Sequence, residues 1–172
     1  MVSLERPGTA EIWTWLAAVE DPEIPVISIV DLGIVRDLRW DDATCVVTVT
    51  PTYSGCPATH VISQAIVDAL HGHGVDDVRI ETRIAPPWTT DWMSEAGKQA
   101  LRDYGIAPPL QRAQTIAVAD IGRGAPTAAP EIACPRCAST AVELVSQFGS
   151  TPCKALYRCK ACREPFDHFK CH

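Results

Sequence analysis

Apolar residues recur at helical and strand spacings through the first two thirds of the chain. Ile12, Leu16 and Val19 lie about one helical turn apart, a spacing that favours an amphipathic helix. Alternation elsewhere favours strands, and Asp41-Asp42 between two of them favours a hairpin turn. The predicted elements are a helix over 11–19, strands over 34–40 and 44–50, a helix over 61–70, a strand over 78–82 and a helix over 91–104. This order predicts an α+β domain in which helices pack against one small sheet.

The last third of the chain has a shorter alternating pattern. The alternating positions are Val142, Leu144, Ser146 and Phe148. Residues 149–152 can turn and residues 154–158 can return as a second strand, so we expect a β-hairpin. Residues 109–130 are rich in Pro, Gly and Ala without periodicity, as linkers are. The sequence therefore predicts a body over 1–108, a linker over 109–130 and a small C-terminal domain over 131–172.

Two Cys-x-x-Cys pairs, Cys134–Cys137 and Cys159–Cys162, lie on either side of this hairpin. Each tight turn directs two sulfurs to one point, and the hairpin brings the two pairs together. Four sulfurs at tetrahedral corners are the ligand set of a structural zinc site. The 21 residues between the pairs are slightly more than the usual spacing of about 15–20. The sequence therefore predicts a zinc ribbon held by these four cysteines.

Two further cysteines in this region leave the ligand set open. Cys153 and Cys171 are possible additional ligands, although a packed thiol is the simpler interpretation of each. Together with Cys159 and Cys162 they could instead hold an iron–sulfur cluster, because such clusters also take four thiolates. His168 is expected to be a solvated imidazole. Spacing does not separate zinc from iron–sulfur here.

Charge and cysteine content restrict the class of protein. The net charge of −6 and the absence of a basic run argue against a nucleic-acid module, whose affinity comes from clustered positive charge. No signal peptide or membrane-spanning stretch is expected, which points to a reducing cytoplasm. The eight cysteines are therefore expected to bind metal or act as thiols rather than form disulfides.

Cys56 lies where a predicted strand ends and a predicted helix begins. Pro57 suits the first position of a helix, because its missing N–H is not needed there. Cys56 would then lie at or beside the N-cap, where free backbone N–H groups and the helix dipole favour a thiolate. Such a thiolate can bind metal or attack an electrophile, whereas the alternative is a cysteine that only caps and packs. Cys45, in line with Val47 and Val49, is expected in the core.

Neighbouring polar residues give Cys56 two possible chemistries. Asp21, Glu23 and Asp31 precede the first strand and could face Cys56 as acid and base, although such residues more often stabilise turns. His60, about one turn further along, is a poor candidate for the base that a nucleophilic cysteine needs. A cysteine-dependent acyl-CoA enzyme and a purely structural interaction subunit both remain alternatives.

Several segments resemble a known family. In the body they are Asp21-Pro-Glu-Ile-Pro25, Asp31-Leu-Gly33, Thr50-Pro-Thr-Tyr-Ser-Gly-Cys-Pro-Ala58 and Trp88-Thr-Thr-Asp-Trp-Met93. They resemble the iron–sulfur assembly domain family that includes SufT. The tail, over 148–159 and 164–171, is similar to that of the PaaD-like members, which are encoded with the multicomponent phenylacetyl-CoA epoxidase.

The resemblance implies an accessory subunit rather than an enzyme. PaaD-like proteins are thought to assist iron–sulfur cluster assembly in the epoxidase system, chiefly in its reductase. The family's functional thiol corresponds to Cys56, which implies transient iron or an iron–sulfur cluster there, beside structural Zn²⁺ in the ribbon. The expected partners are epoxidase components, without nucleic acid or membrane, and a homodimer through the edge of the small sheet is an option.

Overall fold

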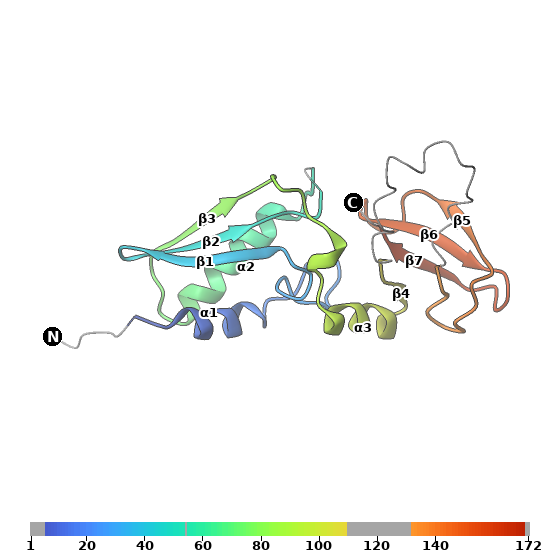
Figure 1. Cartoon of the computed structure of the whole chain (residues 1–172), viewed down its shortest axis with the longest axis horizontal. Helices are drawn as coiled ribbons and strands as arrows, with labels where there is room; N and C mark the ends of the chain where they lie inside the picture. The colour runs from blue at the N-terminus through green and yellow to red at the C-terminus, as the bar shows by residue number, and fades with distance from the viewer. Residues whose placement is uncertain (1–5, 54, 110–131, 171–172) are drawn as a thin grey trace, which may run out of the picture. The chain divides into compact units, whose positions relative to one another are not determined.

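The computed structural model describes residues 6–53, 55–109 and 132–170. Their contacts divide the chain into two compact units, residues 1–88 and 89–172 (Figure 1). Among the described residues, no helix is both long and apolar enough to cross a membrane. The expected α+β architecture is confirmed.

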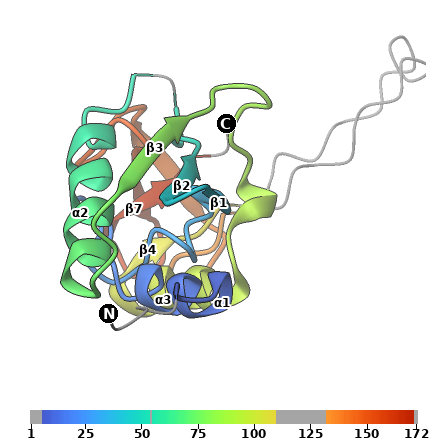
Figure 2. The same ribbon diagram turned by 90° about the vertical axis from the view of Figure 1, so that its left-hand side faces the viewer.

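The first unit contains a three-stranded sheet and two helices. Its elements are α1 (Thr9–Leu16), β1 (Val35–Asp41), β2 (Thr44–Val49), α2 (Thr59–Gly72) and β3 (Val78–Thr82). The sheet order is β1-β2-β3, with β1 antiparallel and β3 parallel to the central β2. The helix α2 connects the two parallel strands and lies along β3, while α1 contacts α2 and β1 (Figure 2). All five predicted elements of this unit are present, and no end is shifted by more than three residues.

The central strand β2 is buried on both faces. Cys45, Val47 and Val49 lie on one face and are at most 1% exposed, so the core position expected for Cys45 is confirmed. The helices contribute the apolar side chains that pack within this unit, namely Ile12, Leu16, Ile62, Ile66 and Leu70. Val46 and Thr48 point to the opposite face and are also fully buried.

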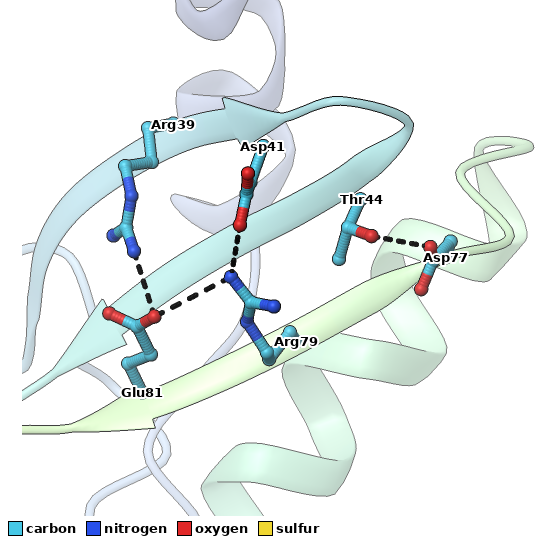
Figure 3. A network of polar contacts seen from close by, with 6 residues as sticks. All are labelled: Arg39, Asp41, Thr44, Asp77, Arg79 and Glu81. Carbon is cyan, nitrogen blue, oxygen red and sulfur yellow. Dashed lines mark hydrogen bonds and ion pairs between the residues drawn. The ribbon is translucent and has the colours of Figure 1, made fainter.

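Charged side chains of the outer strands line this opposite face (Figure 3). Arg39 donates to Glu81 at 2.7 Å, and Arg79 lies between Asp41, at 2.6 Å, and Glu81, at 3.7 Å. Long charged side chains cover apolar surface with their stems, which accounts for the burial of β2 between them. Exposed pairs of this kind contribute little to stability, so burial is the main effect of this network.

The described residues of the second unit form one short helix, one longer helix and a four-stranded sheet. Its elements are η1 (Thr90–Trp92), α3 (Glu95–Tyr104), β4 (Ile106–Ala107), β5 (Val142–Ser146), β6 (Lys154–Cys159) and β7 (Pro165–Phe169). The sheet order is β4-β7-β6-β5, in which β4 and β7 are parallel and the other pairs antiparallel. The predicted hairpin is therefore β5–β6, and β7 and β4 extend it.

The segment between residues 89 and 109 belongs to the second unit. Here α3 contacts β4, and β4 pairs with β7, so this segment packs with the C-terminal sheet. The predicted linker lies almost wholly outside the described residues, and the boundaries at 108 and 131 stay predictions. The helix expected over 91–104 is split, because Met93 is extended and the Ser94 side chain caps a new start by accepting from Gly97 N–H at 2.9 Å.

Candidate functional site

Cys56 lies in the loop between β2 and α2. Its N–H donates to Tyr53 O at 3.2 Å, and its carbonyl accepts from Thr59 N at 3.3 Å and from Thr59 Oγ1 at 3.0 Å. The helix begins at Thr59 with Ala58 as its N-cap, so Pro57 precedes the helix instead of occupying its first position. These bonds fix the Cys56 backbone, but they place its thiol about one turn before the helix.

The Cys56 side chain borders a small apolar pocket within the first unit. Its walls are Ile34, Val49, Pro51, Cys56, Thr59 and Ile62. The pocket has about 10 Å³ of free volume, roughly what one water molecule needs. Sites for drug-sized organic ligands measure about 300–1,000 Å³. The pocket is therefore far too small for an acyl-CoA.

The Cys56 thiol is harder to ionise than an ordinary cysteine. Burial raises its pKa above the usual value, and hydrogen bonding from Ala58 N–H and from Thr59 opposes this rise without cancelling it. The sequence predicts a thiolate favoured by a helix N-terminus, whereas the described surroundings of Cys56 oppose ionisation. The physical reason is that desolvation of the charged form outweighs the few dipoles directed at the sulfur.

Two of the three suspected carboxylates act on Cys56. The charges of Glu23 and Asp21 raise the pKa of the Cys56 thiol, Glu23 more strongly. Asp21 is buried and its Oδ1 accepts from the N–H groups of Glu23 and Ile24, both at 2.9 Å, which fixes this loop. Asp31 instead closes a local turn, where its Oδ2 accepts from Ser28 Oγ at 2.9 Å.

The described surroundings of Cys56 do not favour a nucleophilic reaction. Nearby carboxylates oppose formation of the bare thiolate, whereas a divalent ion bound at the sulfur would favour it. His60 is exposed, and no histidine is among the described groups that shift the pKa of Cys56. Thr59 was not singled out from the sequence, although its place three residues after Cys56 could have suggested it.

The four cysteines of the two pairs meet in the second unit. The sulfurs of Cys134, Cys137, Cys159 and Cys162 all lie within 4.8 Å of one another. Cys134 and Cys162 are 3.8 Å apart at sulfur, and Cys137 and Cys159 are 3.5 Å apart. Four sulfurs placed tetrahedrally about 2.3 Å from zinc would lie about 3.8 Å from one another. The donor set and its spacing therefore fit one zinc ion.

The electrostatics of this cysteine group also favour a cation. Backbone N–H groups of Cys162 and Ala161 lower the pKa of the Cys159 thiol to about 6, against the effect of burial. The Glu164 N–H lowers the pKa of Cys162, but burial and the neighbouring sulfurs outweigh it and raise that pKa to about 12. Four thiolates so close together need a positive ion to ionise fully, and a dication supplies it.

The two additional ligand candidates, Cys153 and Cys171, and the nearby His168 differ in what the structure shows of them. Cys153 is buried, lies 3.0 Å from Thr151 Oγ1 at its sulfur, and is not part of the described cysteine group. Cys171 lies outside the described residues, so a cluster that uses it stays a prediction. His168 is 7% exposed and not solvated as expected, and burial lowers its pKa to about 4.

Comparison with known proteins identifies two domains. Residues 9–82 match the iron–sulfur cluster assembly protein family, and residues 120–170 match the PaaD zinc beta ribbon domain. Both matches lie where the sequence predicts the corresponding chemistry.

Individual relatives align with either the whole chain or about half of it. A protein of Escherichia coli (strain K12), provisionally named as a subunit of 1,2-phenylacetyl-CoA epoxidase, is 45% identical over 171 residues, 99% of this chain and 98% of that protein. The Fe-S protein maturation auxiliary factor YitW of Bacillus subtilis (strain 168) is 40% identical over 88 residues, 50% of this chain and 85% of that protein. A crystal structure of a DUF59 domain from Bacillus anthracis superposes with a TM-score of 0.50 at 32% identity, covering 54% of this chain and 89% of that chain.

Proposed function

Because the chain belongs to the PaaD family, in which an iron–sulfur cluster assembly domain is followed by a zinc beta ribbon, we propose that it is a maturation subunit of a phenylacetyl-CoA epoxidase system. In this role it assists iron–sulfur cluster assembly in the reductase component, in the cytoplasm, through Cys56. The protein itself is then not an enzyme, and the iron or cluster is its cargo rather than a resident cofactor.

One observation carries the proposal: the partly buried Cys56 thiol borders a small apolar pocket and lies within the field of Glu23 and Asp21. Thiolate is a soft ligand that suits iron, and a carboxylate beside it adds affinity for a divalent ion. The raised pKa of Cys56 means that a proton occupies the sulfur when no metal is present. Metal binding then exchanges that proton for a cation, and release restores it.

The same features disfavour a cysteine-dependent acyl-CoA enzyme. A nucleophilic cysteine needs a low pKa or a nearby base, and Cys56 has a raised pKa and no histidine among the described groups that act on it. The pocket beside it is also too small for a thioester substrate.

The ribbon has a structural role in this proposal. Cys134, Cys137, Cys159 and Cys162 would hold one Zn²⁺, which stabilises a small sheet that has few buried apolar residues of its own. No step of cluster handling is assigned to this site.

The proposal is tested by anaerobic loading of the purified full-length chain with Fe²⁺, with and without sulfide. We expect the wild type to bind iron beyond its single zinc, and Cys56→Ala to bind the zinc alone. Cys45→Ala is the matched control, because Cys45 is a buried core thiol whose pKa is raised by burial and by no carboxylate among the described groups. Equal iron binding by wild type and Cys56→Ala would contradict the proposal.

A further inference from the structure

A cavity lies in the first unit, at the other end of β2 from Cys56. Its walls come from α1 and the residues before it, from the β1–β2 hairpin and from the loop that leads into β3. Its volume is about 670 Å³, within the range of about 300–1,000 Å³ that is usual for sites of organic ligands. The indole rings of Trp15 and Trp40 both line it, and we call it the tryptophan cavity.

The two indole rings are held in place by contacts of their own. The Trp15 and His73 rings lie parallel, with 1° between their planes and 4.2 Å between their centres. This stack joins α1 to the end of α2. The Trp40 Nε1–H donates to Pro7 O at 3.3 Å. The aromatic wall of the cavity is therefore fixed by the fold.

One indole of this wall already holds a guanidinium group. Arg6 Cζ lies 4.9 Å from the centre of the Trp40 ring. A cation within about 6 Å of an indole face is attracted by the negative face of the ring. Trp40 thus contacts the guanidinium of Arg6 with its face and the carbonyl of Pro7 with its N–H. These are the two groups that an arginine carried on a polypeptide would present.

The tryptophan cavity contains more negative than positive charge. Glu11, Asp76 and Asp77 line it, and Arg6 is the one arginine or lysine among its described lining residues. Asp77 accepts from Thr44 Oγ1 (Figure 3). The side chains of Glu11 and Asp76 have no hydrogen bond or ion pair with the other described residues. The cavity therefore attracts a further cation and repels an anion.

We propose that the tryptophan cavity binds an arginine side chain of another protein, in the space beside Arg6. A planar guanidinium group can stack on an aromatic ring and donate two parallel hydrogen bonds to a carboxylate. The aromatic wall supplies the first contact, and Glu11 and Asp76 supply the second. This inference goes beyond the proposed function, because no residue of the cavity takes part in the chemistry assigned to Cys56.

The test follows binding of a blocked arginine peptide, acetyl-glycyl-arginyl-glycinamide, to the full-length, zinc-loaded chain by NMR. The indole N–H resonances of Trp15 and Trp40 should shift and saturate as the peptide is added. The resonance of Trp88 is the internal control, because Trp88 is 2% exposed and its indole N–H donates to Leu32 O at 3.0 Å. The peptide with citrulline, which has the shape of arginine without its charge, should bind at least tenfold more weakly. Equal binding of the two peptides, or no shift with the arginine peptide, would overturn the inference.

A pair of matched charge variants tests the carboxylates of the cavity. Glu11→Gln/Asp76→Asn removes the two carboxylates that have no partner among the described residues. The control Glu20→Gln/Asp68→Asn changes the net charge equally at exposed positions of the first unit outside the cavity lining. The cavity variant should bind the arginine peptide about fivefold more weakly or worse, and the control should bind as the wild type does. Equal losses in both variants would contradict a specific site, because they would show general attraction to an acidic protein.

Two further measurements exclude other occupants. Arg6→Ala removes a like charge and frees the face of Trp40, so it should tighten binding of the arginine peptide. Weaker binding in Arg6→Ala would contradict the inference, because Arg6 would then act as a binding group, as in a site for anions. Methylguanidinium alone should bind more weakly than the peptide, and equal affinity would overturn the choice of a protein partner over a small cation. Cys56→Ala should bind the peptide as the wild type does, which separates this test from that of iron binding.

Discussion

Cys56 and Cys159 show how strongly local surroundings decide what a cysteine does. Backbone N–H groups converge on Cys159 and lower its pKa to about 6. Cys56 receives fewer such bonds, is partly buried, and has Glu23 and Asp21 nearby, so its pKa is raised. The Cys159 sulfur therefore suits permanent coordination of a metal ion, whereas the Cys56 sulfur suits a cation that binds transiently.

Glu23→Gln tests the influence of the carboxylate on Cys56. Because the Glu23 charge raises the pKa of the thiol, its removal should lower that pKa while weakening Fe²⁺ binding. The measurement is the pH dependence of iodoacetamide labelling at Cys56, followed by mass spectrometry. Labelling of Cys56 in the wild type should still be increasing above pH 9. The labelling curve of Glu23→Gln should be shifted to lower pH. A plateau in the wild type below pH 8 would contradict the raised pKa.

The sequence could indicate Cys56 and its carboxylates but not the state of the thiol. The Gly55-Cys56-Pro57 turn marks a special position, and Asp21 and Glu23 are close enough in sequence to form one loop. The sign of the pKa shift depends on burial against Ile34, Val49 and Ile62, which come from three separate segments. Spacing along the chain does not report such burial.

At the scale of elements, β7 is the strand that the sequence does not reveal. Its burial pattern places Phe166 and His168 inside the sheet's packing, and His168 lies beside Ala155 of β6 and Ala107 of β4. Five residues with one imidazole among the buried positions make a weak alternation signal. A two-residue strand such as β4 leaves no pattern at all, because it is defined by its partner.

The burial of His168 predicts a pH dependence of stability. Its pKa is lowered from 6.5 to about 4, and its Nε2 has no hydrogen-bond partner among the described residues. Between these values the unfolded chain binds a proton that the folded chain excludes, so stability falls as the pH decreases from 6.5 to 4. The free energy of unfolding decreases by about 3 kcal/mol over this range.

His168→Phe isolates this contribution. The free energy of unfolding in urea should fall less for His168→Phe than for the wild type when the pH is lowered from 7.5 to 5. Comparison of the two pH values cancels any constant packing cost of the phenyl ring, and zinc loss affects both proteins alike. Parallel losses in the two proteins would show that His168 does not titrate as described.

At the scale of the whole molecule, the two units differ in net charge and in the four-cysteine metal site of the second unit. Residues 1–88 carry 13 of the 21 acidic and five of the 15 basic residues, whereas residues 89–172 carry the other eight and ten. The first unit is thus strongly acidic and the second slightly basic. The overall charge of −6, which argued against nucleic acid, conceals this division.

Zinc removal should affect one unit and spare the other. The cysteine group anchors the small core formed by Ala107, Ile132, Cys134, Cys159 and Phe166. A strong chelator should therefore abolish hydrogen-exchange protection in β6 and β7, while β2, buried on both faces, keeps its protection. Simultaneous loss of protection in β2 would show that the two cores do not unfold independently.

In the proposed function, Cys56 delivers iron or a cluster to the epoxidase reductase. The most direct measurement is the iron and acid-labile sulfide content of that reductase, purified from cells that carry either the wild-type chain or Cys56→Ala. We expect a reductase depleted in both iron and sulfide with Cys56→Ala, at equal amounts of the two chains and with one zinc in each. A reductase with full cluster occupancy in the Cys56→Ala cells would contradict the claim.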